Sequence, residues 1–232
     1  MNAAVVIATY NERENLEGLI AAILQHAGYR IIVVDDDSPD GTGALADELA
    51  AEFPAKVSVI HRTGARGLGR SLIAGLQRAL ESGADLIFQM DADFSHDPKY
   101  LADMAAAAAD ADLVLGSRYM RGISVVNWPL HRIVLSSFAN RYIRAVTGLE
   151  VSDCTTGFRC WRREALARLP LEGLISDGYA FLVEQLHLAR RVGCRVREVP
   201  IIFVERREGS SKISSGVLLE SAIVPWRLRL KR

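Results

Sequence analysis

Short apolar segments alternate with segments of helical spacing through the first half of the sequence, and this alternation restricts the fold more than any other feature. The apolar segments are residues 3–8, 31–34, 57–60, 86–90 and 113–115. Between them, apolar residues recur every three or four positions, as at Leu72, Leu76 and Leu80. Short Val- and Ile-rich strands that alternate with helices are typical of βαβ units, and strands covered on both faces are apolar throughout. We therefore predict an α/β domain with a mostly parallel, Rossmann-like sheet flanked by helices.

The alternation becomes less regular after Gly116. Helical spacing returns in residues 133–146 and 179–192, and residues 196–204 have the pattern of a further strand. The final segment, residues 217–230, is apolar and basic, and Pro225 is expected to interrupt it. The sequence shows no internal repeat and no low-complexity linker, so we predict a single domain with a helical C-terminal part.

The composition excludes several classes of protein. Half of the 232 residues are apolar, which is too many for a disordered chain. No segment approaches about 18 consecutive apolar residues, so we expect no membrane-spanning helix. The N-terminal segment lacks the basic start of a signal peptide, and the three cysteines have neither the number nor the spacing of a disulfide framework or a metal site. We therefore expect a cytoplasmic protein.

The net charge of zero conceals a strong asymmetry between the two halves of the chain. Residues 1–112 contain 18 acidic and 8 basic residues, a net charge of −10, whereas residues 113–232 contain 10 acidic and 20 basic residues, a net charge of +10. Residues 113–149 include five arginines and no acid. This distribution indicates either an anionic partner for the second half, such as phosphate, nucleic acid or a membrane surface, or a clustering of charges on a solvated face.

Carboxylates follow two of the predicted strands, at the edge of an open α/β sheet where ligands bind. Asp91 and Asp93 come after the fourth strand, and residues 35–37 are three aspartates after the second. Two carboxylates this close repel each other unless a cation or protons separate them, and Mg²⁺ is commonly held by one or two carboxylates with substrate phosphates. A turn would also explain an isolated Asp-x-Asp motif. The strand-end position favours metal and nucleotide binding, whereas Asp40 is expected to cap a helix.

A glycine-rich segment, residues 64–71, has nearly the spacing of a phosphate-binding P-loop. Arg70 stands where that motif requires lysine, and the segment follows the third predicted strand rather than the first. We interpret the segment as a glycine-rich turn that lets the backbone run close to another group. The sequence contains neither a Gly-x-Ser-x-Gly elbow nor a His-Glu-x-x-His motif, so it does not support serine-hydrolase or zinc-protease chemistry.

The arginines of the acid-free segment are candidates for binding phosphate, because a guanidinium group can bond two phosphate oxygens at once. They are Arg118, Arg121, Arg132, Arg141 and Arg144. Nucleic acid is an alternative target, but the interleaved aromatic residues and the helix or RNP motifs expected of such a protein are missing, so we expect no nucleic-acid partner. A second basic segment, residues 206–212, has the composition of a solvated turn when it is taken alone.

Four motifs together resemble the family 2 glycosyltransferases, which have the GT-A fold. They are Val-Ile-Ala-Thr-Tyr-Asn-Glu-Arg-Glu-Asn-Leu at 6–16, Val-Val-Asp-Asp-Asp-Ser-Pro-Asp-Gly-Thr at 33–42, Met-Asp-Ala-Asp at 90–93 and Gly-Ser-Arg-Tyr at 116–119. Further motifs at 127–129, 153–159, 176–181 and 198–203 narrow the resemblance to the polyprenol-phosphate (dolichol-phosphate) mannose synthases. The resemblance implies a GT-A domain at residues 1–212, with a nucleotide-sugar half at 1–116 and an acceptor half at 117–212. An amphipathic basic tail would follow at 213–232.

The resemblance implies an enzyme that transfers mannose from GDP-mannose to a polyprenyl monophosphate, with inversion at the anomeric carbon and with Mg²⁺ or Mn²⁺ as cofactor. The residues carried over for the nucleotide sugar are Ala8, Tyr10, Glu12, Val34, Asp36, Asp91, Ala92, Asp93, Arg206 and Lys212. Those for the metal are Asp91, Asp93 and Ser95, and those for the acceptor phosphate are Arg118, Arg132 and Ser136. The catalytic set would be Asp91, Asp93, Arg118 and Arg132.

Two residues depart from the family pattern. Ala8 stands where many relatives have proline, and Ser95 stands where they often have a glutamine that helps to bind the metal. Neither change removes a carboxylate, so both bear on the preferred metal rather than on activity. A phosphate with a second pKa of about 6 is already largely a dianion at neutral pH and needs no base. For Asp153 we therefore expect a structural or acceptor-orienting role.

The resemblance also implies contact with a membrane, because a polyprenyl chain does not readily leave the bilayer. Residues 133–146 and 217–230 are candidate interfacial helices, apolar on one side and basic on the other, although a core helix and a frayed tail have the same pattern. The expected location is peripheral, on the cytoplasmic face of the membrane, and a small membrane-anchoring subunit is a further candidate partner.

Two other functions remain open on sequence grounds. A related family 2 transferase could make polyprenyl-phosphate glucose from UDP-glucose, because no single residue identifies the sugar. A non-catalytic module could bind a nucleotide sugar or a lipid phosphate. The intact pair of Asp91 and Asp93 argues against the second alternative, because a binding module does not need a metal to stabilise a leaving group.

Overall fold

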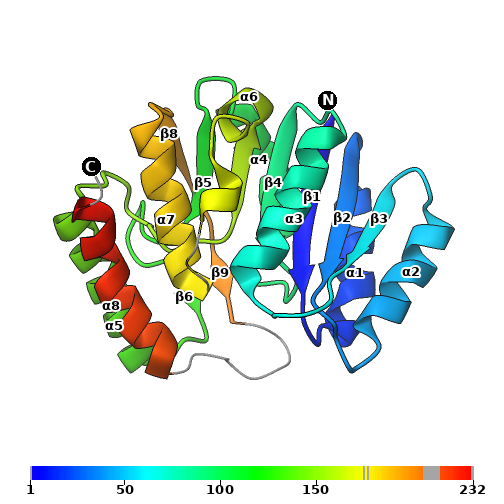
Figure 1. The fold of residues 1–232 in the computed structure, drawn as a ribbon, viewed down its shortest axis with the longest axis horizontal. Coiled ribbons are helices and arrows are strands. Elements are labelled where there is room, and N and C mark those ends of the chain that lie inside the picture. Colours follow the sequence, from blue (N-terminus) through cyan, green and yellow to red (C-terminus); the bar gives the residue numbers. More distant parts are fainter. Residues whose placement is uncertain (1, 175, 177, 206–214, 231–232) are drawn as a thin grey trace.

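The computed structural model describes residues 2–174, 176, 178–205 and 215–230, and its first half follows the predicted alternation (Figure 1). The elements of this half are β1 (Ala3–Thr9), α1 (Arg13–Leu24), β2 (Tyr29–Asp35), α2 (Thr42–Glu52), β3 (Val57–His61), α3 (Leu68–Glu81), β4 (Leu86–Asp91), α4 (Leu101–Ala107) and β5 (Leu113–Ser117). The second half has β6 (Val125–Val126), α5 (Leu130–Thr147), β7 (Arg159–Arg162), α6 (Arg163–Leu166), α7 (Gly178–Arg191), β8 (Val196–Pro200), β9 (Phe203–Val204) and α8 (Ser215–Leu230). Short 3₁₀ turns lie at Pro98–Tyr100 and Leu171–Gly173.

The main sheet has seven strands in the order β3-β2-β1-β4-β7-β5-β8. All neighbouring pairs are parallel except those of β7, which runs antiparallel to both β4 and β5. The predicted mostly parallel α/β sheet is therefore confirmed. Strand β7 was not predicted from the sequence, because its two central residues, Cys160 and Trp161, stand between Arg159 and Arg162 and form no apolar run.

Helices cover both faces of the sheet, and β1 shows how the sequence supports two cores. Ala4 and Val6 pack in the core that also contains residues of α3 and α7, whereas Ala3, Val5 and Ile7 pack in the core with α1 and α4. Successive side chains of a strand point to opposite faces, so a strand buried on both sides is apolar at every position. This explains the continuous apolar runs of the sequence.

Helix α3 lies unusually close to β1 and β2 because it contains Gly75. A Cβ atom at this position would lie 2.3 Å from Cγ1 of Val6 and 2.9 Å from Cγ2 of Val34. Interiors are close-packed, so any side chain here would push the helix away from the sheet. The start of α3, and the glycine-rich segment that precedes it, are thereby held near the carboxyl ends of β1 and β2.

The C-terminal half differs from the sequence prediction at two places. Residues 196–204 form two strands rather than one, since β9 leaves the main sheet and pairs with β6 in a separate two-stranded sheet. Pro225 does not interrupt α8, which continues to Leu230. Val224 and Leu228 are buried in the core, and this packing compensates for the backbone hydrogen bond that proline cannot donate.

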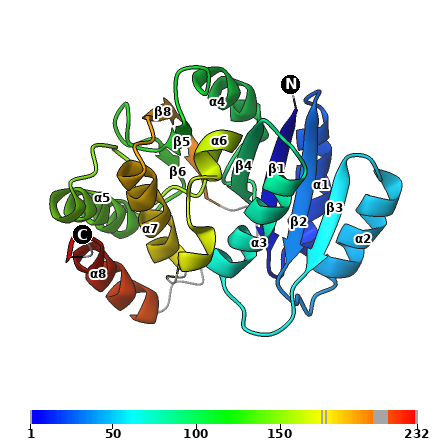
Figure 2. The ribbon, with the colours of Figure 1, turned by 45° about the horizontal axis from the view of Figure 1, so that its top comes forward.

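Helix α8 lies alongside α5 at one end of the molecule (Figures 1 and 2). The hydroxyl of Tyr142 on α5 donates to the backbone oxygen of Ala222 at 2.7 Å, and Nη1 of Arg229 donates to the backbone oxygen of Val146 at 2.9 Å. The two helices therefore form one layer. Within the described part of the chain, none of the helices combines the length and apolar character required to span a bilayer.

Candidate active site

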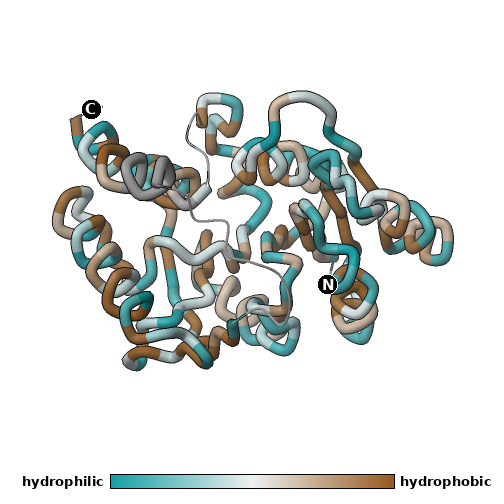
Figure 3. Tube along the Cα trace, turned by 90° about the horizontal axis from the view of Figure 1, so that it is seen from below, coloured by the Kyte–Doolittle hydropathy of each residue, from teal (hydrophilic) through white to brown (hydrophobic). Residues whose placement is uncertain are grey.

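The carboxyl ends of β1 and β4 bring together several of the predicted nucleotide-sugar residues. The chain runs outward from β1 through β2 to β3 and then crosses to β4 on the other side of β1. In open α/β sheets, ligands bind where the strand order reverses in this way. Ala8 lies between Val34 and Asp91 in the register of the sheet, so three residues from separate motifs are neighbours. Figure 3 looks onto this edge of the sheet from below.

Asp36 comes directly after β2 and is buried against the glycine-rich segment. Its carboxylate forms an ion pair with Nη1 of Arg62 and accepts a 2.7 Å hydrogen bond from the backbone N–H of Gly67. This contact is the close backbone approach that we expected of residues 64–71. Arg62 follows β3, and no motif distinguished it in the sequence. The predicted nucleoside carboxylate thus has its orientation fixed by two protein donors.

Two neighbouring aspartates shape the loop rather than face a ligand. Asp35 is buried and accepts hydrogen bonds from the Thr9 hydroxyl at 3.3 Å and from the backbone N–H of Ser38 at 3.2 Å. Asp40 accepts from the backbone N–H of Thr42, the first residue of α2, at 2.9 Å, but the N-cap of α2 is Gly41, so Asp40 precedes the cap instead of occupying it as predicted. Burial raises the pKa of Asp40, but hydrogen bonds from Thr42 and from the backbone N–H of Arg13 outweigh it, so the pKa lies below its ordinary value.

Arg66 connects the loops that follow β1 and β2. Its Nη1 atom donates to the Tyr10 hydroxyl at 2.7 Å, and its guanidinium carbon lies 4.7 Å from the centre of the Tyr10 ring. Its Nη2 atom donates to the backbone oxygen of Asp37 at 3.1 Å. Glu12 directly precedes α1, and its carboxylate accepts a hydrogen bond from the side-chain amide of Asn15 at 3.0 Å. Tyr10 and Glu12 therefore lie near the predicted nucleotide site, with Arg66 as a further basic residue that sequence reasoning missed.

The Asp91–Asp93 loop is organised by His96, which the sequence analysis did not assign to the site. The backbone N–H of Asp91 donates to Nδ1 of His96 at 2.9 Å, and the imidazole ring stacks on Phe158 with centroids 5.0 Å apart. Asp93 accepts hydrogen bonds from the backbone N–H of Ser95 at 3.1 Å and from its hydroxyl at 2.5 Å. The Asp93 residue is buried, whereas the Asp91 side chain is 45% exposed. Asp91 is therefore the more accessible carboxylate.

Gly157 lies directly against this loop. A Cβ atom at Gly157 would lie 3.2 Å from Oδ1 of Asp91 and 3.4 Å from Cε1 of His96. Contacts this short force a neighbour to move, so any larger residue would displace the carboxylate or the ring. The glycine of the 153–159 motif thereby permits the observed positions of the Asp91 carboxylate and the His96 ring.

The acid pair suits a hard divalent cation. Within the described residues, no group of three or more His, Cys, Asp or Glu side chains is close enough together to hold a metal ion. The protein would supply the carboxylates of Asp91 and Asp93, and substrate phosphates would complete the coordination, as is common for Mg²⁺. Ser95, predicted as a further ligand, is buried and donates its hydroxyl to Asp93. Its role as a ligand stays a prediction.

Arg118 follows β5 and is fixed by Asp153. Its Nε and Nη2 atoms donate to the two oxygens of Asp153, both at 2.7 Å, and its backbone N–H donates to the same carboxylate at 3.1 Å. Nη2 also donates to the Thr155 hydroxyl at 2.8 Å. Burial raises the pKa of Asp153, but the charge and hydrogen bonds of Arg118 outweigh it and lower the pKa below its ordinary value. Asp153 is therefore placed to orient Arg118.

The second predicted acceptor arginine, Arg132, and Arg118 both lie close to the indole ring of Trp128. The guanidinium carbon of Arg132 lies 4.1 Å from the ring centre, and that of Arg118 lies 5.6 Å from it. Arg132 also forms an ion pair with Glu205, whose carboxylate accepts from Nη1. Both arginines are thus held by one aromatic ring and by one carboxylate each. Neither Trp128 nor Glu205 was assigned a role from the sequence.

Ser136 lies one helical turn after Arg132 on α5. Its hydroxyl oxygen accepts a 2.7 Å hydrogen bond from the hydroxyl of Tyr119, the residue that follows Arg118. The three predicted acceptor residues are therefore brought together at the carboxyl end of β5. Arg206 and Lys212, predicted to contact the donor phosphates, lie outside the described residues.

Phe203 of β9 connects the acid loop with the arginines. Its ring lies edge-on to His96, with centroids 5.7 Å apart, and edge-on to Trp128, with centroids 5.4 Å apart. The guanidinium carbon of Arg118 lies 5.4 Å from the same ring. An acidic group that can hold a cation and a basic group that can hold an anion therefore share one aromatic wall, although 25 positions separate Asp93 from Arg118 in the sequence.

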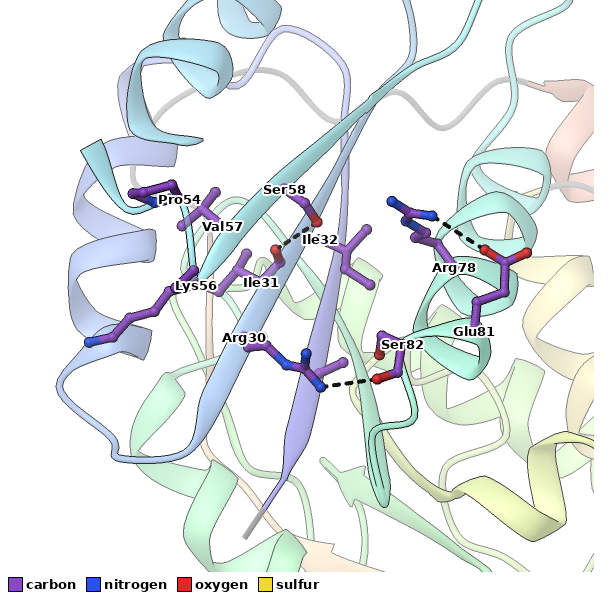
Figure 4. Close-up of a pocket in the computed structure, with 12 residues that line it drawn as sticks. Arg30, Ile31, Ile32, Pro54, Lys56, Val57, Ser58, Arg78, Glu81 and Ser82 are labelled. Carbon is purple, nitrogen blue, oxygen red and sulfur yellow. Dashed lines mark hydrogen bonds and ion pairs between the residues drawn. The ribbon is translucent and has the colours of Figure 1, made fainter. Parts of the chain in front are cut away.

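A separate pocket of about 350 Å³ opens at the opposite edge of the sheet (Figure 4). It is lined by the first residues of β2 and β3 and by the end of α3. Arg30 donates to the backbone oxygen of Ser82 at 3.3 Å, and Arg78 donates to Glu81 at 3.5 Å. None of its lining residues belongs to the predicted site, so its position supports no role in the chemistry at the carboxyl edge.

The mostly parallel sheet with one antiparallel strand is the GT-A-like fold of glycosyltransferases. The chain belongs to glycosyl transferase family 2, whose sequence profile matches residues 4–169. The predicted class of enzyme is therefore confirmed.

Two relatives match nearly the whole chain. It is 46% identical over 230 residues to polyprenol monophosphomannose synthase of Mycolicibacterium smegmatis, and the alignment covers 97% of this chain and 86% of that protein. It is 42% identical over 224 residues to undecaprenyl-phosphate mannosyltransferase of Micrococcus luteus, covering 96% and 92%. Among solved structures, glucosyl-3-phosphoglycerate synthase from Mycobacterium tuberculosis, in complex with Mn²⁺, UDP and glucosyl-3-phosphoglycerate, has a TM-score of 0.69 at 19% identity, covering 98% and 79%. At that identity the likeness concerns the fold alone.

Proposed function

We propose that this glycosyltransferase transfers mannose from GDP-mannose to a polyprenyl monophosphate. The observation that carries the proposal is the acid pair at the end of β4 beside the two arginines that flank Trp128, with Phe203 between the two groups. A donor diphosphate with its metal needs an acidic group, and an acceptor phosphate needs a basic group. The transfer requires these two groups to lie next to each other. The two relatives, whose names specify mannose and a polyprenyl phosphate, support the same sugar and the same class of acceptor.

On the donor side, Asp91 and Asp93 would hold Mg²⁺ or Mn²⁺ together with the diphosphate, and Ser95 would keep Asp93 in place. A divalent cation at this position stabilises the negative charge that develops on the leaving diphosphate. The guanosine would lie among residues at the ends of β1 and β2. These are Ala8, Tyr10, Glu12, Val34 and Asp36, with Ala92 beside the diphosphate.

On the acceptor side, Arg118, Arg132 and Ser136 would bind the phosphate of the lipid. A phosphate oxygen forms a bond to the anomeric carbon of mannose while the bond from that carbon to the β-phosphate oxygen of GDP breaks, which inverts the configuration. The phosphate is already a dianion at neutral pH, so no base has to remove a proton. The task of the protein is to position this oxygen, and the Asp153 carboxylate contributes by orienting Arg118.

The surface near the arginines supports a peripheral contact with a membrane. In the described part of the chain, every large apolar side chain that is exposed lies between residues 120 and 230. They are Met120, Ile123, Val126, Leu130, Val134, Leu135, Phe138, Ile202, Val204, Ile223, Trp226 and Leu230. Those from Leu130 to Phe138 lie on α5 and the last three lie on α8, and these two helices also carry the exposed arginines Arg141, Arg144 and Arg227. A mixed apolar and basic surface of this kind binds the interface of an anionic bilayer, here its cytoplasmic face.

The proposed function is tested by measuring sugar transfer to a short-chain polyprenyl phosphate. The assay compares GDP-mannose, GDP-glucose and UDP-glucose, each with Mg²⁺, with Mn²⁺ and with a chelator. We expect product from GDP-mannose only, and only when a divalent metal is present. Product from UDP-glucose alone would retain the reaction and replace the donor, whereas product in the presence of chelator would contradict the role of the acid pair.

A further inference from the structure

We propose that Glu205 is a positioning residue that neutralises Arg132 in the empty site and releases it to the acceptor phosphate. The proposal rests on the proposed function, because it takes Arg132 as a phosphate-binding residue. It adds a residue that controls how tightly the acceptor binds. The contact that motivates it is the ion pair between the Glu205 carboxylate and Nη1 of Arg132.

The backbone on each side of this ion pair is fixed. The N–H of Glu205 donates to the backbone oxygen of Val126 at 3.1 Å, which continues the pairing of β9 with β6. The N–H of Arg132 donates to the backbone oxygen of Pro129 at 3.0 Å in the first turn of α5. The guanidinium group in addition lies over Trp128. The guanidinium group of Arg132 is therefore already confined by its surroundings. The Glu205 carboxylate helps to hold this guanidinium group where the phosphate is to bind.

The two carboxylates that hold the arginines differ in how easily they can leave. Asp153 is completely buried and binds Arg118 through two side-chain atoms and the backbone. Removing it would leave a buried guanidinium without its counter-ion, which is strongly unfavourable. The Glu205 side chain is 23% exposed and that of Arg132 is 20% exposed, so Glu205 can turn toward water at little cost.

The net charge of the two arginines and their two carboxylates indicates why one carboxylate has to be displaced. The two arginines and two carboxylates carry no net charge together, so the complete group offers a dianionic phosphate little net attraction. Displacement of Glu205 leaves a net positive charge around Trp128. Arg132 then exchanges one anionic partner for another, while Arg118 keeps its orientation through Asp153.

The test is a pair of substitutions that both remove the charge of Glu205 but differ in whether Arg132 keeps a hydrogen-bond acceptor. Glu205→Gln removes the charge but keeps an oxygen that can accept from Arg132, whereas Glu205→Ala removes both. For each variant we expect the KM for a short-chain polyprenyl phosphate to fall by about threefold to tenfold, because a partly exposed ion pair competes only moderately with the phosphate. The KM for GDP-mannose should stay within about twofold of wild type. Only Glu205→Ala should also lower kcat, since Arg132 then loses its support.

Two controls separate this exchange from a general effect of charge. Asp110→Asn changes the net charge equally at an exposed ion pair with Arg197, at the other edge of the sheet, and should leave both KM values unchanged. Glu205→Asp keeps the charge and should keep the acceptor KM near the wild-type value. An acceptor KM equal to or above that of wild type in both Glu205→Gln and Glu205→Ala would overturn the proposal, as would an equal fall in Asp110→Asn.

A binding measurement distinguishes failure of this proposal from failure of the proposed function. Calorimetric titration of short-chain polyprenyl phosphate, without donor, into wild type and Glu205→Gln should give tighter binding to the variant. Tighter binding to the variant supports the exchange of partners by Arg132 even if the wild-type protein transfers no mannose. Absence of mannose transfer would contradict only the proposed function. Equal or weaker binding to the variant, or binding to neither protein, overturns the proposal for Glu205.

Discussion

Asp153 and Arg118 form a buried ion pair in which Nε and Nη2 of the arginine each lie 2.7 Å from a different carboxylate oxygen. The two residues come from segments 35 positions apart, the loop after β5 and the segment before β7. Planar, bidentate pairing fixes both the position and the plane of a guanidinium group. The orientation of a predicted acceptor residue is therefore set by a carboxylate that has no access to solvent.

Replacing this carboxylate should destabilise the fold. Asp153→Asn leaves the buried Arg118 without its counter-ion, and we expect the free energy of unfolding to fall by about 3 kcal/mol. Urea denaturation followed by circular dichroism measures the change. The matched control is Glu81→Gln at the exposed Arg78–Glu81 pair on α3, which should cost less than about 0.5 kcal/mol. Equal stability of Asp153→Asn and wild type would contradict the importance of the pair.

The same ion pair predicts a direction for the pH dependence of stability. The pKa of Asp153 in the folded protein lies below its ordinary value of 3.8, because Arg118 stabilises the carboxylate. Its stabilising contribution is therefore complete above the ordinary pKa and is lost as the pH falls through the lower folded-state pKa. The difference in unfolding free energy between wild type and Asp153→Asn should be constant from about pH 7 to about pH 5 and shrink below about pH 4. A difference that grows on acidification would refute this assignment.

His96 should determine how well the acid loop binds a metal. His96→Phe keeps a ring on Phe158 but leaves the backbone N–H of Asp91 without its acceptor, which costs about 1–3 kcal/mol. We expect Mn²⁺ affinity, measured by electron paramagnetic resonance in the presence of GDP, to fall by at least about tenfold. His131→Phe, an exposed histidine on α5, serves as the control and should leave Mn²⁺ binding intact. Unchanged affinity in His96→Phe would mean that the loop does not depend on this hydrogen bond.

The exposed apolar residues of α5 should govern binding to membranes. Phe138→Asp places a charge on the proposed interfacial surface and removes a large ring, so cosedimentation with anionic vesicles should fall by about tenfold. Transfer to a water-soluble short-chain acceptor should persist. Ala102→Asp on the exposed surface of α4 adds the same charge elsewhere and should bind vesicles as wild type does. Equal vesicle binding by all three proteins would exclude α5 from the interface.

The α/β fold could be predicted because its strongest signals are local. The strands β1 to β5 are apolar at nearly every position, since two cores cover the sheet, and the acids that follow them come to one edge in any parallel arrangement. The acid pair and the arginines could be named before the structure because their chemistry is recognisable from residue type. Their proximity to one another, by contrast, depends on β7 and β9.

The residues that connect the site could not be predicted because they act through tertiary contacts. His96 was one of five scattered histidines, and its role arises from an acceptor nitrogen placed beside the backbone of Asp91. Glu205 precedes a basic segment and lies 73 positions from the arginine it pairs with. Pro225 was expected to interrupt the segment 217–230, but the packing of α8 on its neighbours outweighs the lost hydrogen bond. Such effects depend on which elements meet in space.

The role of the acid pair in catalysis is tested by mannose transfer from GDP-mannose to a short-chain polyprenyl phosphate in Asp91→Asn and Asp97→Asn. Both substitutions remove one negative charge from the same loop, but Asp97 caps the turn at Pro98–Tyr100, accepting from the backbone N–H of Lys99 at 2.9 Å. We expect Asp91→Asn to lower kcat by at least about 100-fold, because the leaving diphosphate loses its metal. Asp97→Asn should retain kcat within about threefold. Turnover by Asp91→Asn at the wild-type rate would show that the acid pair does not hold the metal that the reaction needs.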